Sequence, residues 1–251
     1  MSLAPEARAI GRSLRTYYAP GRAAALDGFL GRFLREGELG FDIGAHVGDR
    51  TASFRRLGAR AVAVEPQPRL ARLLRLLFGR DPGVTLVPVL LGSQPGEGRL
   101  HLNSANPTVA TASETFMAAA RNGAGWEGQV WDGAVAVPVT TLDALIAREG
   151  EPAFIKLDVE GFEAAALAGL TRPVRSLSFE FTLLQREVAL DALAMVEALG
   201  PYRFNACLGE EMRFVLDAPA HAGTLARWLR DLPDAVNSGD IYASLEEARV
   251  T

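Results

Sequence analysis

Two short apolar segments of this sequence each end in an acidic turn. Residues 40–50 read Gly-Phe-Asp-Ile-Gly-Ala-His-Val-Gly-Asp-Arg, and residues 61–66 read Ala-Val-Ala-Val-Glu-Pro. Gly44 and Gly48 lack a Cβ, so the chain can turn tightly there and approach a ligand closely. Glu65, at the end of the second segment, can accept both hydroxyls of a ribose with its two carboxylate oxygens. The two segments therefore predict a site for a nucleotide-type cofactor.

The glycine spacing and the charge of this loop favour a cationic ligand. The spacing is Gly-x-x-x-Gly and not Gly-x-Gly-x-x-Gly, and a pyrophosphate needs backbone N–H groups crowded at a helix N-terminus. Asp42, Asp49 and Glu65 make the loop acidic, and we expect a helix to open near Thr51. S-adenosylmethionine, with its sulfonium and amino group, suits such a site. A nicotinamide-dependent oxidoreductase is the alternative enzyme, and the missing third glycine weighs against it.

Further carboxylates lie where other apolar segments end. Asp158 ends the segment 153–158, and Glu180 lies near the end of 176–182. Ligands of open parallel sheets bind at the carboxyl ends of the strands, where a set of acids can orient a cationic cofactor and deprotonate a substrate. Lys156, the only lysine of the chain, stands beside them. Arginine cannot replace a lysine wherever a compact ammonium or a deprotonated amine is needed.

A parallel sheet would bring these residues to one edge. The apolar segments are continuous and alternate with helical patterns, which predicts an α/β fold with a mostly parallel sheet and helices on both faces. The expected strands are 38–43, 60–65, 84–91, 135–139, 153–158, 176–182, 202–205, 212–216 and 240–243, with a hairpin or edge strand within 93–103. The expected helices are about 49–57, 67–78, 141–149, 162–169, 186–199 and 222–231.

We expect a single large domain, 37–251, preceded by an N-terminal helical cap, 1–36, whose helix breaks around Pro20 and Gly21. The segment 103–134 is rich in Asn, Thr, Ser, Gly and Ala, and we interpret it as a lid-like insertion; a surface insertion without a role is the alternative. Its aromatic residues either stack on a sugar or cofactor or form a small core of the insertion: Phe116, Trp126 and Trp131.

Composition limits the kind of protein and of partner. With 251 residues, 49% of them hydrophobic and 22% charged, the chain can bury a sizeable core. Its 26 basic and 30 acidic residues give a net charge of −4, which disfavours nucleic acid as a partner. Cys207, the single cysteine, fits a reducing compartment, and we find neither a signal peptide nor an apolar segment of about 18 residues. We expect a cytoplasmic protein that does not bind membranes.

Four motifs, taken in order, resemble those of the FkbM-type methyltransferases. They are residues 41–51, the Val-Glu-Pro at 64–66, the Thr-Thr-Leu-Asp at 140–143 and the Ile-Lys-Leu-Asp-Val-Glu-Gly at 155–161. The first motif alone indicates only a class I methyltransferase, whereas the last, preceded by Thr-Leu-Asp, is far more specific. The resemblance covers about 38–182 and extends weakly to 243.

The resemblance implies a Rossmann-like, seven-stranded, mostly parallel sheet and S-adenosylmethionine as cofactor. It also implies methylation of a hydroxyl on a sugar, glycan or polyketide-like small molecule. By position, Asp42, Gly44 and Gly48 would line the methionine end and Glu65 would hold the ribose; we add Thr51, at the helix start, to the cofactor loop. His46 also belongs to this loop, at a position where the family usually has Asn, and we expect it to pack there.

The mechanism we expect is transfer of the sulfonium methyl to a substrate oxygen with help from a base. Asp158 is the first choice for the base and Glu160 the second, and Lys156 would tune or orient the pair. Asp158 and Glu180 could instead bind Mg²⁺, but the sequence has no dedicated metal cluster and we expect no metal. A methyltransferase-like module without catalysis is the remaining alternative.

Overall fold

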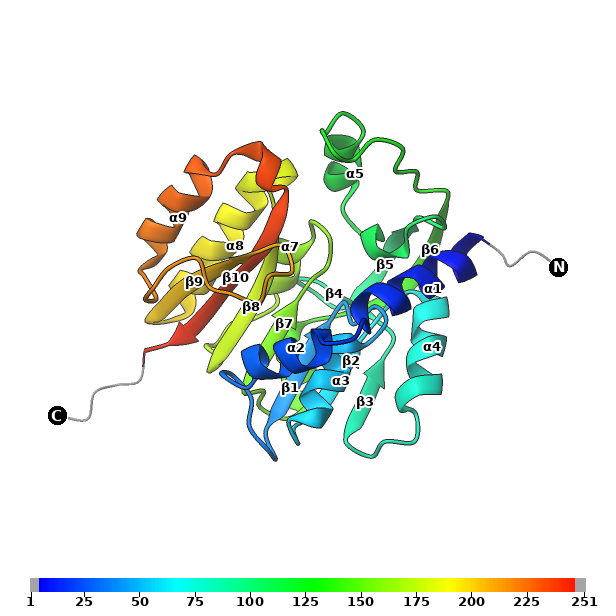
Figure 1. Cartoon of the computed structure of the whole chain (residues 1–251), viewed down its shortest axis with the longest axis horizontal. Coiled ribbons are helices and arrows are strands. Elements are labelled where there is room, and N and C mark those ends of the chain that lie inside the picture. Colours follow the sequence, from blue (N-terminus) through cyan, green and yellow to red (C-terminus); the bar gives the residue numbers. More distant parts are fainter. Residues whose placement is uncertain (1–4, 247–251) are drawn as a thin grey trace.

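A seven-stranded sheet forms the centre of the molecule in the computed structural model, which describes residues 5–246 (Figure 1). Its strand order is β3-β2-β1-β7-β8-β10-β9, and only β10 is antiparallel to its neighbours. The bounds are Leu39–Ile43 for β1, Arg60–Val64 for β2, Val84–Val87 for β3, Phe154–Leu157 for β7, Ser176–Thr182 for β8, Tyr202–Leu208 for β9 and Ser238–Leu245 for β10. The expected seven-stranded, mostly parallel sheet is therefore confirmed.

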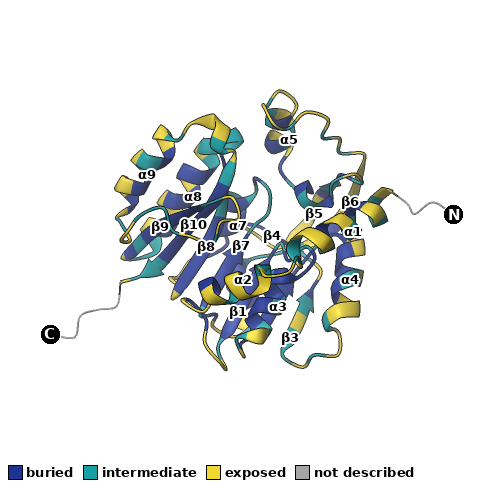
Figure 2. Ribbon diagram, in the orientation of Figure 1, coloured by how far each residue is buried: buried dark blue, intermediate teal, exposed yellow. Residues whose placement is uncertain are grey.

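Helices cover both faces of this sheet, because successive residues of each strand point to opposite sides. In β7, Phe154 packs with the helices of one face and Ile155 with those of the other. The first face carries α2 (Arg22–Leu30) and α3 (Asp49–Arg56), beside α4 (Pro68–Phe78). The second face carries α6 (Leu142–Glu149), α7 (Glu163–Leu167), α8 (Arg186–Leu199) and α9 (Ala222–Asp231). Figure 2 shows the strands buried between exposed outer helix faces.

A second sheet of three strands, which we did not predict, lies beside the first. It consists of β4 (Leu90–Leu91), β6 (Gly133–Thr140) and β5 (Gly96–Leu102) in that order. The expected strand 84–91 was wrong as one element, since it divides between the two sheets at Pro88. Proline has no N–H to give to a strand ladder, so a strand can end there and the chain can join another sheet.

The expected strand at 212–216 was also wrong. The segment pairs with β9 through one backbone hydrogen bond, from Val215 N to Ala206 O at 2.8 Å. Its next residue, Leu216, is bonded by a side chain instead, since Asn205 donates to its carbonyl at 2.9 Å and accepts from its N–H at 3.1 Å. A side-chain amide that satisfies the backbone in this way competes with a strand ladder.

The N-terminal segment is helical in two pieces, as expected. α1 (Pro5–Tyr17) and α2 are separated at Gly21, which has the left-handed φ of 83°. α1 lies against the insertion, where Arg12 Nη2 donates to the carbonyl of Ala105 at 2.6 Å. Within residues 5–246 no helix combines the length and the apolar character that crossing a membrane requires.

The insertion after β5, green in Figure 1, contains a 3-10 turn η1 (Pro107–Val109) and helix α5 (Glu114–Ala120). Phe116 is fully buried and makes edge-to-face contacts with Trp126 and Trp131, at centroid distances of 5.0 and 6.1 Å. Trp131 also donates its indole N–H to the carbonyl of Val109 at 2.9 Å. Of the two alternatives for these aromatic residues, the structure therefore supports a core of the insertion.

Candidate functional site

A cavity opens where the strand order reverses, at the carboxyl ends of β1 and β7. From β1 the chain runs outward through β2 and β3, and it returns to pair β7 with the other side of β1. Ligands of open α/β sheets bind at this switch point. The cavity is open to solvent, and its space together with that open mouth amounts to about 890 Å³. Seven of the nine expected site residues line it: Asp42, Gly44, His46, Glu65, Lys156, Asp158 and Glu160.

Asp42 and Thr51 form one unit at the start of α3. One Asp42 carboxylate oxygen accepts from the Thr51 N–H at 2.9 Å and from the Thr51 hydroxyl at 2.5 Å, and both residues are buried. Burial raises the pKa of Asp42 to about 6, although the Thr51 hydrogen bond opposes the shift. Thr51 does not line the cavity. Thr51 therefore acts on the expected cofactor loop through Asp42, whose carboxylate it holds in place.

The two glycines of the first motif are needed for different reasons. Gly44 has a φ of 79°, and a Cβ there would overlap the carbonyl oxygen of Asp158. Gly44 therefore allows the loop after β1 to touch the loop after β7. Gly48 has a φ of 81° and lies outside the cavity, where a Cβ would be 2.6 Å from the Phe78 ring. Gly48 is therefore needed for packing against Phe78, and it does not contact the cavity.

Glu65 is fixed by two backbone N–H groups. One oxygen accepts from His46 N and the other from Gln67 N, both at 2.8 Å. A carboxylate offers about four lone-pair positions, so each oxygen can accept one more hydrogen bond, as two ribose hydroxyls would require. Burial raises the pKa of Glu65 to about 7. The side chain therefore fits the role expected for it.

His46 leaves a polar atom unused at the cavity. Its Nε2 is buried and has no hydrogen-bond partner within residues 5–246, and its ring meets Tyr17 edge-on at 5.5 Å. Burial lowers the pKa of His46 to about 4, so the imidazole is neutral at pH 7. Buried polar atoms are nearly always satisfied. This orphaned nitrogen, together with the free lone pairs of Glu65, fits a cavity that takes a polar ligand.

Lys156 joins two carboxylates, one of which the sequence analysis missed. Its ammonium donates to Asp240 Oδ1 at 2.8 Å and to Asp158 Oδ2 at 3.1 Å. Burial opposes its charge, yet the two aspartates raise the pKa of Lys156 well above its usual value. We expected Lys156 to orient Asp158 and Glu160. The ammonium instead bonds to Asp158 and Asp240, and Glu160 receives no hydrogen bond from it.

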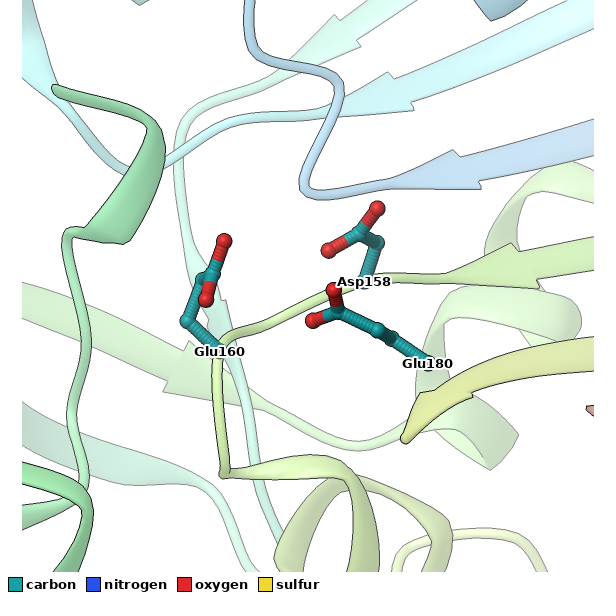
Figure 3. A group of neighbouring side chains, drawn as sticks. All are labelled: Asp158, Glu160 and Glu180. Atoms are coloured by element: carbon teal, nitrogen blue, oxygen red, sulfur yellow. The ribbon is translucent and has the colours of Figure 1, made fainter. Parts of the chain in front are cut away.

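The carboxylate of Asp158 also lies close to those of Glu160 and Glu180, so that three carboxylates form a cluster (Figure 3). Oxygens of Asp158, Glu160 and Glu180 all lie within 4.8 Å of one another. Burial, and then the charge of nearby carboxylates, raises the pKa of both glutamates well above the usual range. Carboxylate oxygens are ligands that Mg²⁺ accepts, but an acidic cluster alone does not define a metal site. The expected absence of a metal stays a prediction.

In the outer part of the cavity, Asp49 and Arg50 of the first motif meet Tyr17 and Glu210, which no sequence motif marked. Arg50 forms ion pairs with Asp49 at 3.0 Å and with Glu210 at 2.8 Å, and Tyr17 of α1 lies beside them. Although burial opposes the shift, Arg50 and Arg22 lower the pKa of Glu210 to about 2. In all, the lining contains two basic residues against seven acidic ones, which are Asp42, Asp49, Glu65, Asp158, Glu160, Glu180 and Glu210. This excess of carboxylates suits a cationic ligand.

The strand order, the single antiparallel strand and the acidic cavity at the switch point define a Rossmann-like α/β protein with its ligand site at the carboxyl ends of the strands. A family model described as the methyltransferase FkbM domain matches residues 42–215. The chain belongs to this family of methyltransferases. The match confirms the resemblance seen in the motifs, and it argues against the alternative of a nicotinamide-dependent oxidoreductase.

The fold is similar to that of a solved methyltransferase structure. A TehB-like SAM-dependent methyltransferase from Corynebacterium glutamicum superposes with a TM-score of 0.51 at 13% identity, covering 94% of this chain and 96% of the other. An O-methyltransferase from Bacillus cereus, in complex with SAH, gives a TM-score of 0.48 at 12% identity, with coverages of 95% and 91%. Comparison with curated proteins gave no sequence match. Membership of this methyltransferase family bears out S-adenosylmethionine as the expected cofactor.

Proposed function

We propose that this methyltransferase transfers the methyl group of S-adenosylmethionine to a hydroxyl of a sugar, glycan or polyketide-like small molecule. The observation that carries the proposal is the position of Asp158. Its carboxylate lines the same cavity as the acidic cofactor loop, and its side chain keeps 30% of its surface exposed. Asp158 can therefore meet an acceptor that enters beside the cofactor.

When bound, S-adenosylmethionine supplies an electrophilic methyl group on a sulfonium ion. Glu65 would hold its ribose hydroxyls, and the acidic lining around Asp42 would favour its positive charge. His46 offers its unpaired Nε2 as one further hydrogen-bonding atom. These residues bind and orient the cofactor, and alignment of two reactants can supply up to about 10 kcal/mol of the barrier reduction.

Asp158 serves as the general base in this proposal. An alcohol is a poor nucleophile, and removing its proton as the new bond forms typically accelerates a reaction by about 10²–10⁴. Asp158 Oδ2 faces Lys156, and within residues 5–246 no donor occupies Oδ1. The free oxygen can accept the hydroxyl proton. Glu160 is the alternative base, because its raised pKa makes its ionised form a strong proton acceptor.

The test begins with calorimetric titration of S-adenosylmethionine. Mass spectrometry of candidate glycans and hydroxylated metabolites then identifies the acceptor by the gain of one methyl group. Asp158→Asn should lower kcat by about 100-fold or more while cofactor affinity stays within about twofold. Asp231→Asn, at an exposed site on α9, is the matched control. Undiminished turnover of the Asp158 variant would reject Asp158 as the base, and a protein that binds cofactor without any turnover would favour the non-catalytic module.

A metal-assisted variant of the same reaction is the second candidate, and the cluster of Asp158, Glu160 and Glu180 favours it. A bound Mg²⁺ would acidify the acceptor hydroxyl in place of a protein base. Activity should survive dialysis against a chelator if no metal takes part, as we propose. Loss of activity in chelator and its return with Mg²⁺ would overturn that view.

The cytoplasm is the compartment we propose. Cys207 is buried, and burial raises the pKa of its thiol to about 12, so the single cysteine behaves as a small apolar residue. A chain without a cysteine pair fits a reducing environment. We further propose that the acceptor is a small molecule or glycan, and that neither nucleic acid nor a membrane is a partner.

A further inference from the structure

A chain of polar contacts runs from the interior of the sheet to the cavity. Tyr242 OH donates to Asp240 Oδ2 at 3.5 Å, and Asp240 Oδ1 accepts from Lys156 at 2.8 Å. Lys156 in turn donates to Asp158 Oδ2 at 3.1 Å. Lys156 is the only lysine of the protein. The contacts thus connect β10 with the end of β7 through one ammonium ion.

The register of the strands explains why these side chains meet. Lys156 of β7 is opposite Ser178 of β8, which in turn is opposite Tyr242 of β10. Partners in register point to the same face of a sheet, as do residues two positions apart. Asp240 and Lys156 therefore share a face although β8 lies between their strands. Ser178, on the strand between them, is fully buried, and its hydroxyl has no hydrogen-bond partner within residues 5–246. The ammonium therefore bonds to Asp240 of β10 and not to the nearer strand.

The two carboxylates on Lys156 differ in their surroundings. The Asp240 side chain is 11% exposed and does not line the cavity, whereas Asp158 is 30% exposed and does. The bond to Asp240 is also the shorter of the two. A buried ammonium needs carboxylates around it, since an uncompensated buried charge is strongly destabilising. Asp240 is thus the interior partner of the ammonium and Asp158 is the partner that faces the ligand.

We propose that Asp240 is a positioning residue for methyl transfer. Asp240 binds the Lys156 ammonium from the interior side. Lys156 then donates to only one oxygen of Asp158 and leaves the other oxygen free. This role depends on the proposed function, in which Asp158 accepts the hydroxyl proton. An ammonium bonded to one carboxylate alone stabilises its charged form more strongly and opposes proton uptake by it. Loss of Asp240 would therefore weaken the base without touching the cofactor.

The single lysine allows a direct test by NMR. With ¹⁵N-lysine labelling, the protein gives one side-chain ammonium signal, which belongs to Lys156. We expect Asp240→Asn to shift this signal and to speed its hydrogen exchange by about tenfold or more, because the ammonium loses its stronger partner. Asp240→Glu, which keeps the charge, should restore slow exchange. Asp231→Asn, at an exposed site, should leave the signal unchanged.

Kinetics with the identified acceptor complete the test. Asp240→Asn should lower kcat by about 100-fold with KM for S-adenosylmethionine close to wild type, and Asp240→Glu should recover most of the rate. Asp240→Asn should also lower the unfolding temperature, because the buried ammonium loses one of its two carboxylates, so the rates are compared well below that temperature. An unchanged lysine signal or an unchanged kcat in Asp240→Asn would overturn the role, as would a parallel loss of cofactor affinity. If the wild-type protein neither binds S-adenosylmethionine nor turns over, the proposed function fails first, whatever the lysine signal shows.

Discussion

The carboxylates of the cavity differ in what holds each of them. Asp42 accepts from Thr51, Glu65 from two backbone N–H groups and Asp158 from Lys156. The carboxylates of Glu160 and Glu180 receive no hydrogen bond from residues 5–246, and the pKa values of both are raised by burial. A carboxylate with both oxygens held, as in Glu65, can orient a ligand, whereas one with an oxygen free of donors, as in Asp158, can accept a proton. In the proposed function, cofactor binding around Glu65 is therefore separate from proton transfer at Asp158.

Cofactor binding should depend on pH through Glu65, whose pKa is about 7 in the ligand-free protein. Ribose hydroxyls donate to the ionised carboxylate, so binding favours that form and releases a proton below pH 7. The affinity should therefore be highest above about pH 8 and fall by up to about tenfold per pH unit as the pH drops from about 7 to about 5.5. Asp42, whose pKa burial raises to about 6, should contribute to the loss of affinity in the lower part of this pH range.

Calorimetry in two buffers of different ionisation enthalpy measures the released proton directly. Glu65→Gln should bind more weakly and should lose most of the pH dependence above pH 6. His46 does not contribute in this range, because burial lowers its pKa to about 4. An affinity that stays constant between pH 5.5 and pH 8.5 in the wild-type protein would contradict the assignment of the ribose to Glu65.

At the scale of elements, the site depends on how closely the loop after β1 approaches the loop after β7. Asp158 N also donates to the carbonyl of Ile43 at 3.0 Å, which fixes Asp158 relative to the loop after β1. This contact is possible only because Gly44 lacks a side chain. The conformation of two loops, and not of one motif, therefore determines where Asp158 stands.

Substitution of Gly44 tests this close approach, and Gly21 provides a matched control. Both have a left-handed φ, 79° and 83°, but a Cβ at Gly44 would overlap Asp158 whereas nothing lies within 4 Å at Gly21. Gly21→Ala should lower the free energy of unfolding by about 1–2 kcal/mol, the cost of the left-handed conformation alone. Gly44→Ala should lower it by about 3 kcal/mol or more. Urea unfolding measures both values, and equal losses would show that the loops separate easily.

At the scale of the whole molecule, the cavity joins segments from both halves of the sheet. The ends of β1 and β2 contribute Asp42 and Glu65, β7 and β8 contribute Asp158 and Glu180, and α1 adds Tyr17. A ligand that contacts all of them binds the folded protein only. Its binding free energy should therefore appear as stability of the entire domain.

S-adenosylhomocysteine at about 100 times its Kd should raise the free energy of unfolding by about 2.7 kcal/mol, in a single transition. Differential scanning calorimetry at several ligand concentrations provides the measurement. A nicotinamide dinucleotide serves as the control and should leave the transition unchanged. Two separate transitions, only one of which moves with ligand, would show that the two halves of the sheet do not unfold together.

Local patterns in the sequence were enough to predict most elements and the cofactor loop. β8, α8 and α9 have the predicted bounds, because their apolar spacing and their end residues are local signals. Asp42 and Glu65 were found for the same reason, since each lies at the carboxyl end of its own strand. The division of 84–91 between two sheets was missed, because strand pairing depends on partners far away in the chain.

By itself the sequence determined the family, most of the strands and helices, and the identity of the acids at the ends of β1, β2 and β7. Only the tertiary structure decided which of them act together. Lys156 and Asp240 lie 84 positions apart and meet through the register of three strands, and Glu210 reaches Arg50 across 160 positions. No motif contains both members of such a pair. Contacts of this kind arise from packing and strand register, which local propensity does not encode.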